Sequence, residues 1–124
     1  MIRNKKYNHY QIKLYLNARH YITLYGSKGT VHPHTWEFVL RMRFPAEMFI
    51  EFKEIEDRLN ECLKKYQNKL LNDCPPFNNV NPLLENVCDI TALEFAKIIK
   101  DMGGELTWLS LSETPTRTYI YSEG

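Results

Sequence analysis

Hydrophobic and polar residues alternate along two long segments in the first part of the chain. In the first segment, residues 10–24, the apolar phase consists of Tyr10, Ile12, Leu14, Leu16, Ala18, Ile22 and Leu24. In the second, from about Pro33 to Phe44, it consists of Trp36, Phe38, Leu40 and Met42. A period of two is typical of strands with one buried face, so we expect two strands that pair antiparallel. The connection YGSKGTVH is expected to be a loop that needs a positive φ at Gly26 or Gly29.

A spacing of three and four residues replaces this alternation after Pro45 and predicts two helices. The first contains the apolar positions Phe52, Ile55, Leu59, Cys62, Leu63 and Tyr66. The second is predicted to begin at a capping box formed by Thr91 and Glu94 and to end at Gly103 and Gly104. Its predicted buried positions are Ala92, Phe95, Ala96, Ile99 and Met102. Residues 67–88, rich in Asn and Pro, are expected to form a long irregular connection between the helices.

Two short strands, LTWLSLSE and RTYIYS, are predicted after the second helix, separated by a turn that contains Pro115. The complete order, ββααββ, predicts a single α+β domain spanning residues 1–124. In this domain two helices cover one face of a four-stranded antiparallel sheet. The open edges of such a sheet need shielding, and assembly with other subunits is one way to provide it.

Composition and charge argue against several classes of partner. The 16 basic and 15 acidic residues leave a formal net charge of +1, which favours a small-molecule or protein partner over nucleic acid or an anionic membrane surface. No apolar run approaches the ~20 residues of a membrane span, and no apolar signal region follows the basic start, so we expect a cytoplasmic protein. The cysteines, Cys62, Cys74 and Cys88, are widely spaced and indicate neither a disulfide framework nor a thiolate zinc site.

Three of the four histidines fall on the predicted core face of the first two strands. His20 is in phase with Leu16, and His32 and His34 continue the apolar phase of the second strand. Residues i and i+2 of a strand point to the same side, so all three can reach one ion, and three imidazoles suit zinc with an open fourth position. A shared metal would also satisfy ring nitrogens that are costly to bury without partners. On the residues alone, surface or capping histidines remain an equal alternative, and His9 is expected to be solvated.

Several short motifs occur in the order and spacing of a known family. NARHYI places a histidine at the end of the first strand, and VHPHTWEF opens the next strand with a His-x-His pair. Further matches are Glu51-Phe52, Leu71-Asn72, Ile90-Thr91 and Glu113-Thr114. Together, over nearly the whole chain, these motifs resemble the 6-pyruvoyl tetrahydropterin synthase and 6-carboxytetrahydropterin synthase family. The fold of that family, the T-fold, has the same ββααββ order.

The resemblance implies a set of functional residues and an assembly. It implies a zinc ion (Zn²⁺) held by His20, His32 and His34, and a pterin whose 2-amino and ring NH groups are bound by Glu113 in a pocket between subunits. Thr91 is implied as a second substrate-binding residue. A carboxylate suits the role given to Glu113 because it accepts two parallel hydrogen bonds. The resemblance also implies a homo-oligomer, either a trimer or a hexamer of two stacked trimers.

The chain departs from the family at the positions that carry acid and base chemistry. Lys28 stands where the family has a cysteine that acts as general base. Gln67 and Asn68 stand where the family has an Asp-His pair that relays protons. Pro33 replaces the middle residue of His-Gly-His, and residues 73–88 resemble an inserted loop.

The missing base leaves two candidates in the sequence. Lys28 is the first, because a lysine that is desolvated near Zn²⁺ can have a lowered pKa and accept a proton. Cys74 or Cys88, brought in by the inserted loop, is the second, although both are more typical of structural cysteines.

Three functions follow as hypotheses. The first is a zinc-dependent, pterin-processing lyase similar to 6-carboxytetrahydropterin synthase, which would act on 7,8-dihydroneopterin triphosphate or a related pterin in 7-deazaguanine or queuosine formation. The second is a divergent, catalytically altered member that binds zinc and a pterin-like heterocycle without the standard reaction. The third is a structural oligomer in which zinc only stabilises the fold.

Overall fold

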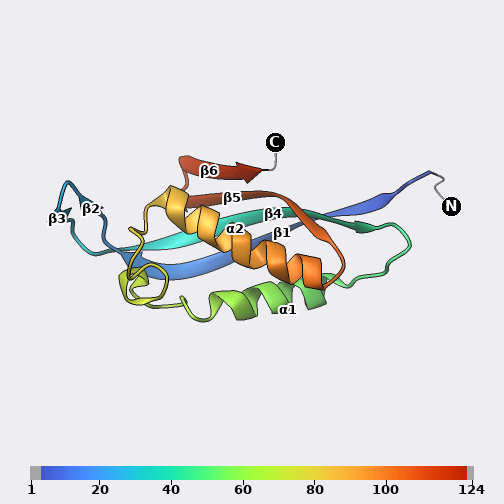
Figure 1. The fold of residues 1–124 in the computed structure, drawn as a ribbon, viewed down its shortest axis with the longest axis horizontal. Coiled ribbons are helices and arrows are strands. Elements are labelled where there is room, and N and C mark those ends of the chain that lie inside the picture. Colours follow the sequence, from blue (N-terminus) through green and yellow to red (C-terminus); the bar gives the residue numbers. More distant parts are fainter. Residues whose placement is uncertain (1–3, 123–124) are drawn as a thin grey trace.

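The computed structural model describes residues 4–122 as an antiparallel four-stranded sheet with two helices on one face (Figure 1). The sheet has the order β1-β4-β5-β6 and consists of β1 (Tyr7–His20), β4 (His32–Pro45), β5 (Glu105–Thr114) and β6 (Arg117–Ser122). The helices are α1 (Phe52–Leu63) and α2 (Leu84–Asp101). The predicted α+β class and the ββααββ order of the long elements are confirmed. No helix within residues 4–122 is both long and apolar enough to cross a membrane.

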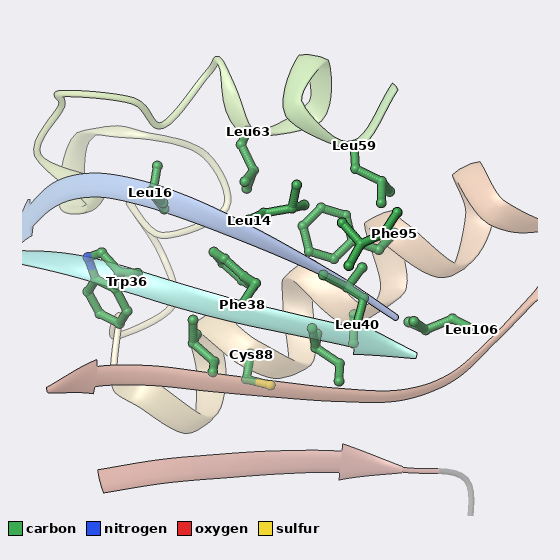
Figure 2. Packing of buried hydrophobic residues seen from close by; sticks show 14 of the residues in the cluster. Leu14, Leu16, Trp36, Phe38, Leu40, Leu59, Leu63, Cys88, Phe95 and Leu106 are labelled. Atoms are coloured by element: carbon green, nitrogen blue, oxygen red, sulfur yellow. The ribbon is translucent and has the colours of Figure 1, made fainter. Parts of the chain in front are cut away.

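The strands β1 and β4 form one long pair whose even-numbered residues face the helices. The register places Leu16 opposite Trp36, and His20 opposite His32 at the end of the pair. The residues that follow this phase are buried from Ile12 to His20 and from Trp36 to Phe44. Figure 2 shows several of them, such as Leu14 and Phe38, packed against the helix residues Leu59 and Phe95, with Trp36 at one end of the labelled cluster. The predicted alternation therefore sets both the core and the side on which the histidines lie.

The connection between β1 and β4 is a small hairpin rather than the expected continuation of the strand and a loop. The strand β1 ends at His20, and β2 (Thr23–Leu24) pairs with β3 (Ser27–Lys28). Leu24, predicted on the buried phase, is 55% exposed because the chain has already left the sheet. Tyr25 and Gly26 form the turn with φ of 52° and 80°, which confirms the positive φ expected at Gly26. Figure 1 shows this hairpin projecting from the end of the sheet.

The start of the second helix was predicted wrongly. α2 begins at Leu84, about two turns before the expected capping box, and Thr91 lies in its interior. The buried Thr91 hydroxyl donates to the carbonyl of Val87, four residues earlier in the same helix. Glu94 instead accepts a hydrogen bond from the Tyr66 hydroxyl at 3.0 Å and pairs with Lys65. Thr91 and Glu94, which match the pattern of a capping box, thus make other hydrogen bonds from the interior of α2.

The irregular connection between the helices is correspondingly shorter than predicted. α1 ends at Leu63, and Tyr66 is fully buried in the turns that follow it. A 3-10 turn, η1 (Leu71–Asp73), comes next, and the last residues of the predicted insertion, 84–88, belong to α2. Gly103, with φ of 100°, ends α2 as expected.

Candidate metal centre

Three histidines converge where β1 ends and β4 begins. One ring nitrogen from each of His20, His32 and His34 lies within 4.8 Å of the others. His20 is fully buried and His34 is 17% exposed, and both rings lie edge-on to Trp36, with centroids 4.9 and 5.5 Å away. The group arises directly from the register, which sets His20 opposite His32 and places His34 two residues further along β4. The histidines are brought together by the sheet, as their shared phase predicts.

The ring nitrogens of His20 and His32 make three short contacts. His20 Nδ1 lies 2.8 Å from the Pro82 carbonyl oxygen, and His32 Nδ1 lies 2.8 Å from the Thr30 carbonyl oxygen. The two Nε2 atoms lie 2.9 Å from each other. Carbonyl oxygens can only accept hydrogen bonds, so both Nδ1 atoms must carry the proton. Two neutral imidazoles then have no proton left, and two Nε2 lone pairs face each other.

A third proton in this pair would require a charged imidazolium, which burial opposes at His20. Burial lowers the pKa of His20 from 6.5 to about 4; the hydrogen bond with Pro82 acts in the opposite direction, and His32 and His34 lower the pKa further. Burial also lowers the pKa of His34, more strongly than the facing Glu113 carboxylate raises it. At neutral pH the rings of His20 and His34 therefore favour the neutral form, and this is the form in which histidine donates a lone pair to a metal.

The carboxylate of Glu113 faces the same group. Its Oε2 lies 3.6 Å from Nε2 of His20 and 3.7 Å from Nε2 of His34. This oxygen is buried, and within residues 4–122 no group donates a hydrogen bond to it. The bare Nε2 of His20 and the carboxylate oxygen of Glu113 thus face each other without a proton between them. Because a cation removes that repulsion, the donor set fits a bound metal ion.

Irregularities in β5 aim Glu113 at the histidines. Thr107 is an extra residue in the pairing of β5 with β4, and it transfers the core face to odd-numbered residues, so Leu109 and Leu111 are buried. A second shift in register, between β5 and β6, falls at Glu113 itself. Bulges of this kind are frequent next to functional sites because they redirect a side chain. The shared phase of Leu109, Leu111 and Glu113 is a sequence signal for this placement.

The segment before α2 fixes the end of β1 and orients His20. The Asn72 side chain accepts from the Tyr21 N–H at 3.0 Å and donates to the Tyr21 carbonyl at 3.0 Å. The Asn81 side chain bonds Thr23 in the same way, at 3.1 and 2.7 Å. Pro82 follows and presents its carbonyl to His20 Nδ1. These outer contacts were not predicted, since a main-chain carbonyl has no sequence signal, although the Asn-rich composition of the loop hints at them.

The other predicted site residues lie apart from these contacts. Lys28 is exposed on β3, with its Nζ 4.4 Å from the centroid of the Tyr21 ring. The Thr91 hydroxyl is buried and bonded within its own helix. His9 lies within β1, not before it, and is exposed as expected. Binding or catalysis by Lys28 and Thr91 stays a prediction.

The positions of the missing proton relay have a structural use. Gln67 donates from Nε2 to the Tyr15 carbonyl at 2.9 Å and accepts from the Asn17 N–H at 3.0 Å. Asn68, with φ of 60°, donates its N–H to the Asn17 carbonyl. Both residues therefore hold the outer edge of β1, and Asn68 also lines a hollow that His34 borders.

Within residues 4–122, the contacts of the three cysteines do not support them as a replacement for the family's proton relay. All three thiols are free, and burial raises the pKa of Cys88 to about 12 and of Cys62 to about 11. The Cys74 thiol donates to the carbonyls of Lys65 and Leu70. Thiols in this state are poor bases and nucleophiles.

Comparisons with known proteins agree on one family and one fold. The family model for 6-pyruvoyl tetrahydropterin synthase matches residues 9–124. The 6-pyruvoyl tetrahydropterin synthase of Caenorhabditis elegans has a TM-score of 0.81 at 14% identity, with 100% of each chain covered. The Plasmodium falciparum synthase has a TM-score of 0.72 at 14% identity, and that of Plasmodium vivax 0.70 at 13%, each covering 96% of this chain and 99% of its own. A search of curated proteins finds no match.

Proposed function

The chain belongs to the 6-pyruvoyl tetrahydropterin synthase family, and from this premise we propose that it is a zinc-dependent lyase that processes a pterin. Its substrate is 7,8-dihydroneopterin triphosphate or a related pterin, and its reaction resembles that of 6-carboxytetrahydropterin synthase in 7-deazaguanine or queuosine formation. Membership of the 6-pyruvoyl tetrahydropterin synthase family supports a pterin as the substrate class.

One observation supports a bound metal ion in this proposal. The three contacts made by His20 and His32 need three hydrogen atoms, whereas two neutral imidazoles supply two. A cation at the two Nε2 atoms, shared with His34, takes the place of the third. Three imidazoles are the donor set of catalytic zinc, which when bound acidifies a coordinated hydroxyl and polarises a carbonyl.

The protein's own residues then bind and orient the substrate. Glu113 accepts hydrogen bonds from the 2-amino and ring NH groups of the pterin, which fixes the ring with its side chain towards the histidines. The fully buried Trp36 ring lies edge-on to His20 and His34. It forms an apolar surface on the core side of the two histidines and limits the access of water from that side. Lys28 is the candidate base that takes a proton from the substrate side chain, and Thr91 is the second candidate for substrate binding.

We place this site in a homo-oligomer, either a trimer or a hexamer. In the single chain β1 and β6 are the outer strands of the sheet, each paired on one side only. β1 is partly covered by Gln67 and Asn68, but β6 keeps an open edge of hydrogen-bonding groups that a second subunit can pair.

A turnover assay on zinc-loaded protein tests the proposal. Purified protein with one zinc per chain is incubated with 7,8-dihydroneopterin triphosphate, and the products are separated by chromatography. We expect consumption of the substrate that depends on zinc and is lost in Glu113→Ala. No consumption by protein with verified zinc would contradict the lyase.

The second candidate function is a family member that binds zinc and a pterin-like heterocycle without the reaction. It is favoured by the observation that Lys28 contacts the Tyr21 ring and that Gln67 holds a strand edge, so neither contact brings a replacement for the family's base or relay to the histidines. Calorimetry separates the two functions. Binding of a pterin without consumption supports the second, and no binding of any pterin contradicts both.

A further inference from the structure

We infer that Asn81 is a positioning residue that couples the β2–β3 hairpin to the proposed metal ligand His20. The Asn81 side chain bonds Thr23, the first residue of β2, and the next residue in the chain, Pro82, bonds the His20 ring. These hydrogen bonds belong to the chain itself, whereas their effect on metal binding rests on the metal of the proposed function.

The Asn81 amide contacts the start of the hairpin at two points. Its Oδ1 accepts from the Thr23 N–H at 3.1 Å, and its Nδ2 donates to the Thr23 carbonyl at 2.7 Å. Thr23 pairs with Lys28 across the hairpin. The Gly29 N–H donates to the Ile22 carbonyl at 2.8 Å and closes the base of the hairpin. A displacement of the hairpin as one body therefore moves the Asn81 side chain with it.

The backbone of Asn81 is held from the side of α2. Its carbonyl accepts from the Asn86 side chain at 2.8 Å and from the Leu83 N–H at 2.8 Å. Pro82 lies between Asn81 and Leu83, is buried, and has its φ fixed by the proline ring. Because Pro82 has little freedom of its own, the direction of its carbonyl depends on where Asn81 lies. Asn81 thus sets whether an acceptor faces Nδ1 of His20.

The bond with Pro82 selects the nitrogen of His20 that is free for a metal. A carbonyl oxygen 2.8 Å from Nδ1 can only accept, so it keeps the ring proton on Nδ1 and leaves Nε2 bare towards His32. His32 has a separate acceptor, the Thr30 carbonyl. Loss of the Asn81 side chain should therefore disturb His20 and spare His32.

The coupling acts in both directions because linkage between two binding events is reciprocal. A metal that immobilises His20 also favours the bonded position of Pro82, and through Asn81 it favours the closed contact with Thr23. Metal binding is therefore expected to steady the base of the hairpin, although the hairpin contributes no ligand to the histidine group.

Nuclear magnetic resonance tests the coupling without an activity assay. Hydrogen exchange is measured at the Thr23 amide in metal-free and zinc-loaded protein, and at the Nδ1–H groups of His20 and His32 in zinc-loaded protein. Competition with a chromophoric chelator gives the affinity for zinc. His32 is an internal control, because its Nδ1–H bonds a carbonyl that Asn81 does not hold.

Three variants are compared with wild type. Asn81→Ala removes both bonds to Thr23. Asn86→Ala removes one of the two bonds to the Asn81 carbonyl and is the milder variant if Asn81→Ala does not fold. Asn79→Ala is the matched control, since Asn79 is exposed in the same loop. Circular dichroism confirms that each variant is folded.

Zinc should slow exchange of the Thr23 amide about tenfold in wild type and in Asn79→Ala. In Asn81→Ala this protection is lost, and the Nδ1–H of His20 exchanges about tenfold faster while that of His32 is unchanged. The affinity of Asn81→Ala for zinc falls about 10- to 100-fold. Asn86→Ala shifts the same quantities in the same direction by a smaller factor.

Two results overturn the role of Asn81 and leave the histidine site standing. One is an Asn81→Ala protein whose zinc affinity and His20 exchange equal those of wild type. The other is equal acceleration of exchange at His20 and His32, which would show a general loosening of the fold. A wild type that binds no zinc overturns the proposed metal, and the coupling with it.

Discussion

The histidine cluster and the β2–β3 hairpin adjoin each other in the sequence but differ in how firmly the fold sets their side chains. His20 and His32 are opposed in the sheet register, and each has its Nδ1 bonded to a main-chain carbonyl. Lys28, on the hairpin, is exposed and contacts only the ring of Tyr21 among aromatic groups within residues 4–122. A single protomer thus fixes the three histidines that could hold a metal, and it leaves the proposed base without a fixed position.

One part of the proposed chemistry depends on assembly, and the other part does not. Metal ligands need a fixed geometry, which a sheet register supplies within one chain. A base on a projecting hairpin acquires a defined place only against another surface, such as the neighbouring subunit of the proposed oligomer. Measurements on the two regions test this difference, and the largest effect is expected at the histidines.

Removal of a central histidine is expected to have the largest effect on metal binding. In His32→Ala the affinity for zinc should fall about 10²–10³-fold, since ~10–16 kcal/mol of binding is shared among about four ligands. His9→Ala is the matched control, because His9 is exposed on the same sheet and its loss should leave the affinity unchanged. Competition with a chromophoric chelator measures both. Equal affinities of the two variants would show that the cluster is not the site.

The stability of the metal-free protein should fall in acid because of His20. Its pKa is about 4 in the folded chain against 6.5 when unfolded, so between these values the unfolded chain binds more protons and stability decreases as the pH falls. Between pH 7 and pH 5 the loss from this group is about 2 kcal/mol. Urea unfolding in the presence of EDTA measures it. His20→Asn should lose this part of the pH dependence, whereas His9→Asn should retain it.

Loss of the Asn72 hydrogen bonds at the end of β1 should have a smaller effect on zinc affinity. Asn72→Ala removes two hydrogen bonds to the main chain of Tyr21 and is expected to lower the free energy of unfolding by about 1–3 kcal/mol. Because His20 is then less well oriented, zinc affinity should fall about tenfold. Asn79→Ala, an exposed position in the same loop, should change neither quantity. Unaltered affinity in Asn72→Ala would mean that His20 is oriented by the sheet alone.

Substitution in the hairpin should leave metal binding intact. Lys28→Met is expected to change zinc affinity less than about twofold, because Lys28 pairs with the Tyr21 ring rather than with the histidines. Turnover of a pterin by the same variant tests the predicted base. A fall of about 10²-fold or more with unchanged affinity would establish Lys28 as the base, and unchanged turnover would remove it.

Alternation predicted the sheet and the histidine cluster because a period of two assigns both the face and the partner of each residue. Trp36 and His34 lie where this phase puts them. The start of α2 was missed because the Thr91 hydroxyl can bond to a carbonyl of its own helix as readily as it caps one. The carbonyls of Thr30 and Pro82 were missed because every residue carries a carbonyl, and only the folded chain selects which ones face a ring.

A crystal structure of the zinc-loaded protein, with anomalous diffraction recorded at the zinc edge, tests the metal centre most directly. The account predicts one zinc per chain, bonded at about 2.0–2.1 Å to Nε2 of His20, His32 and His34. The Nδ1 contacts of His20 with Pro82 and of His32 with Thr30 should persist. Zinc bound elsewhere, with the two Nε2 atoms still in contact and no metal between them, would contradict it.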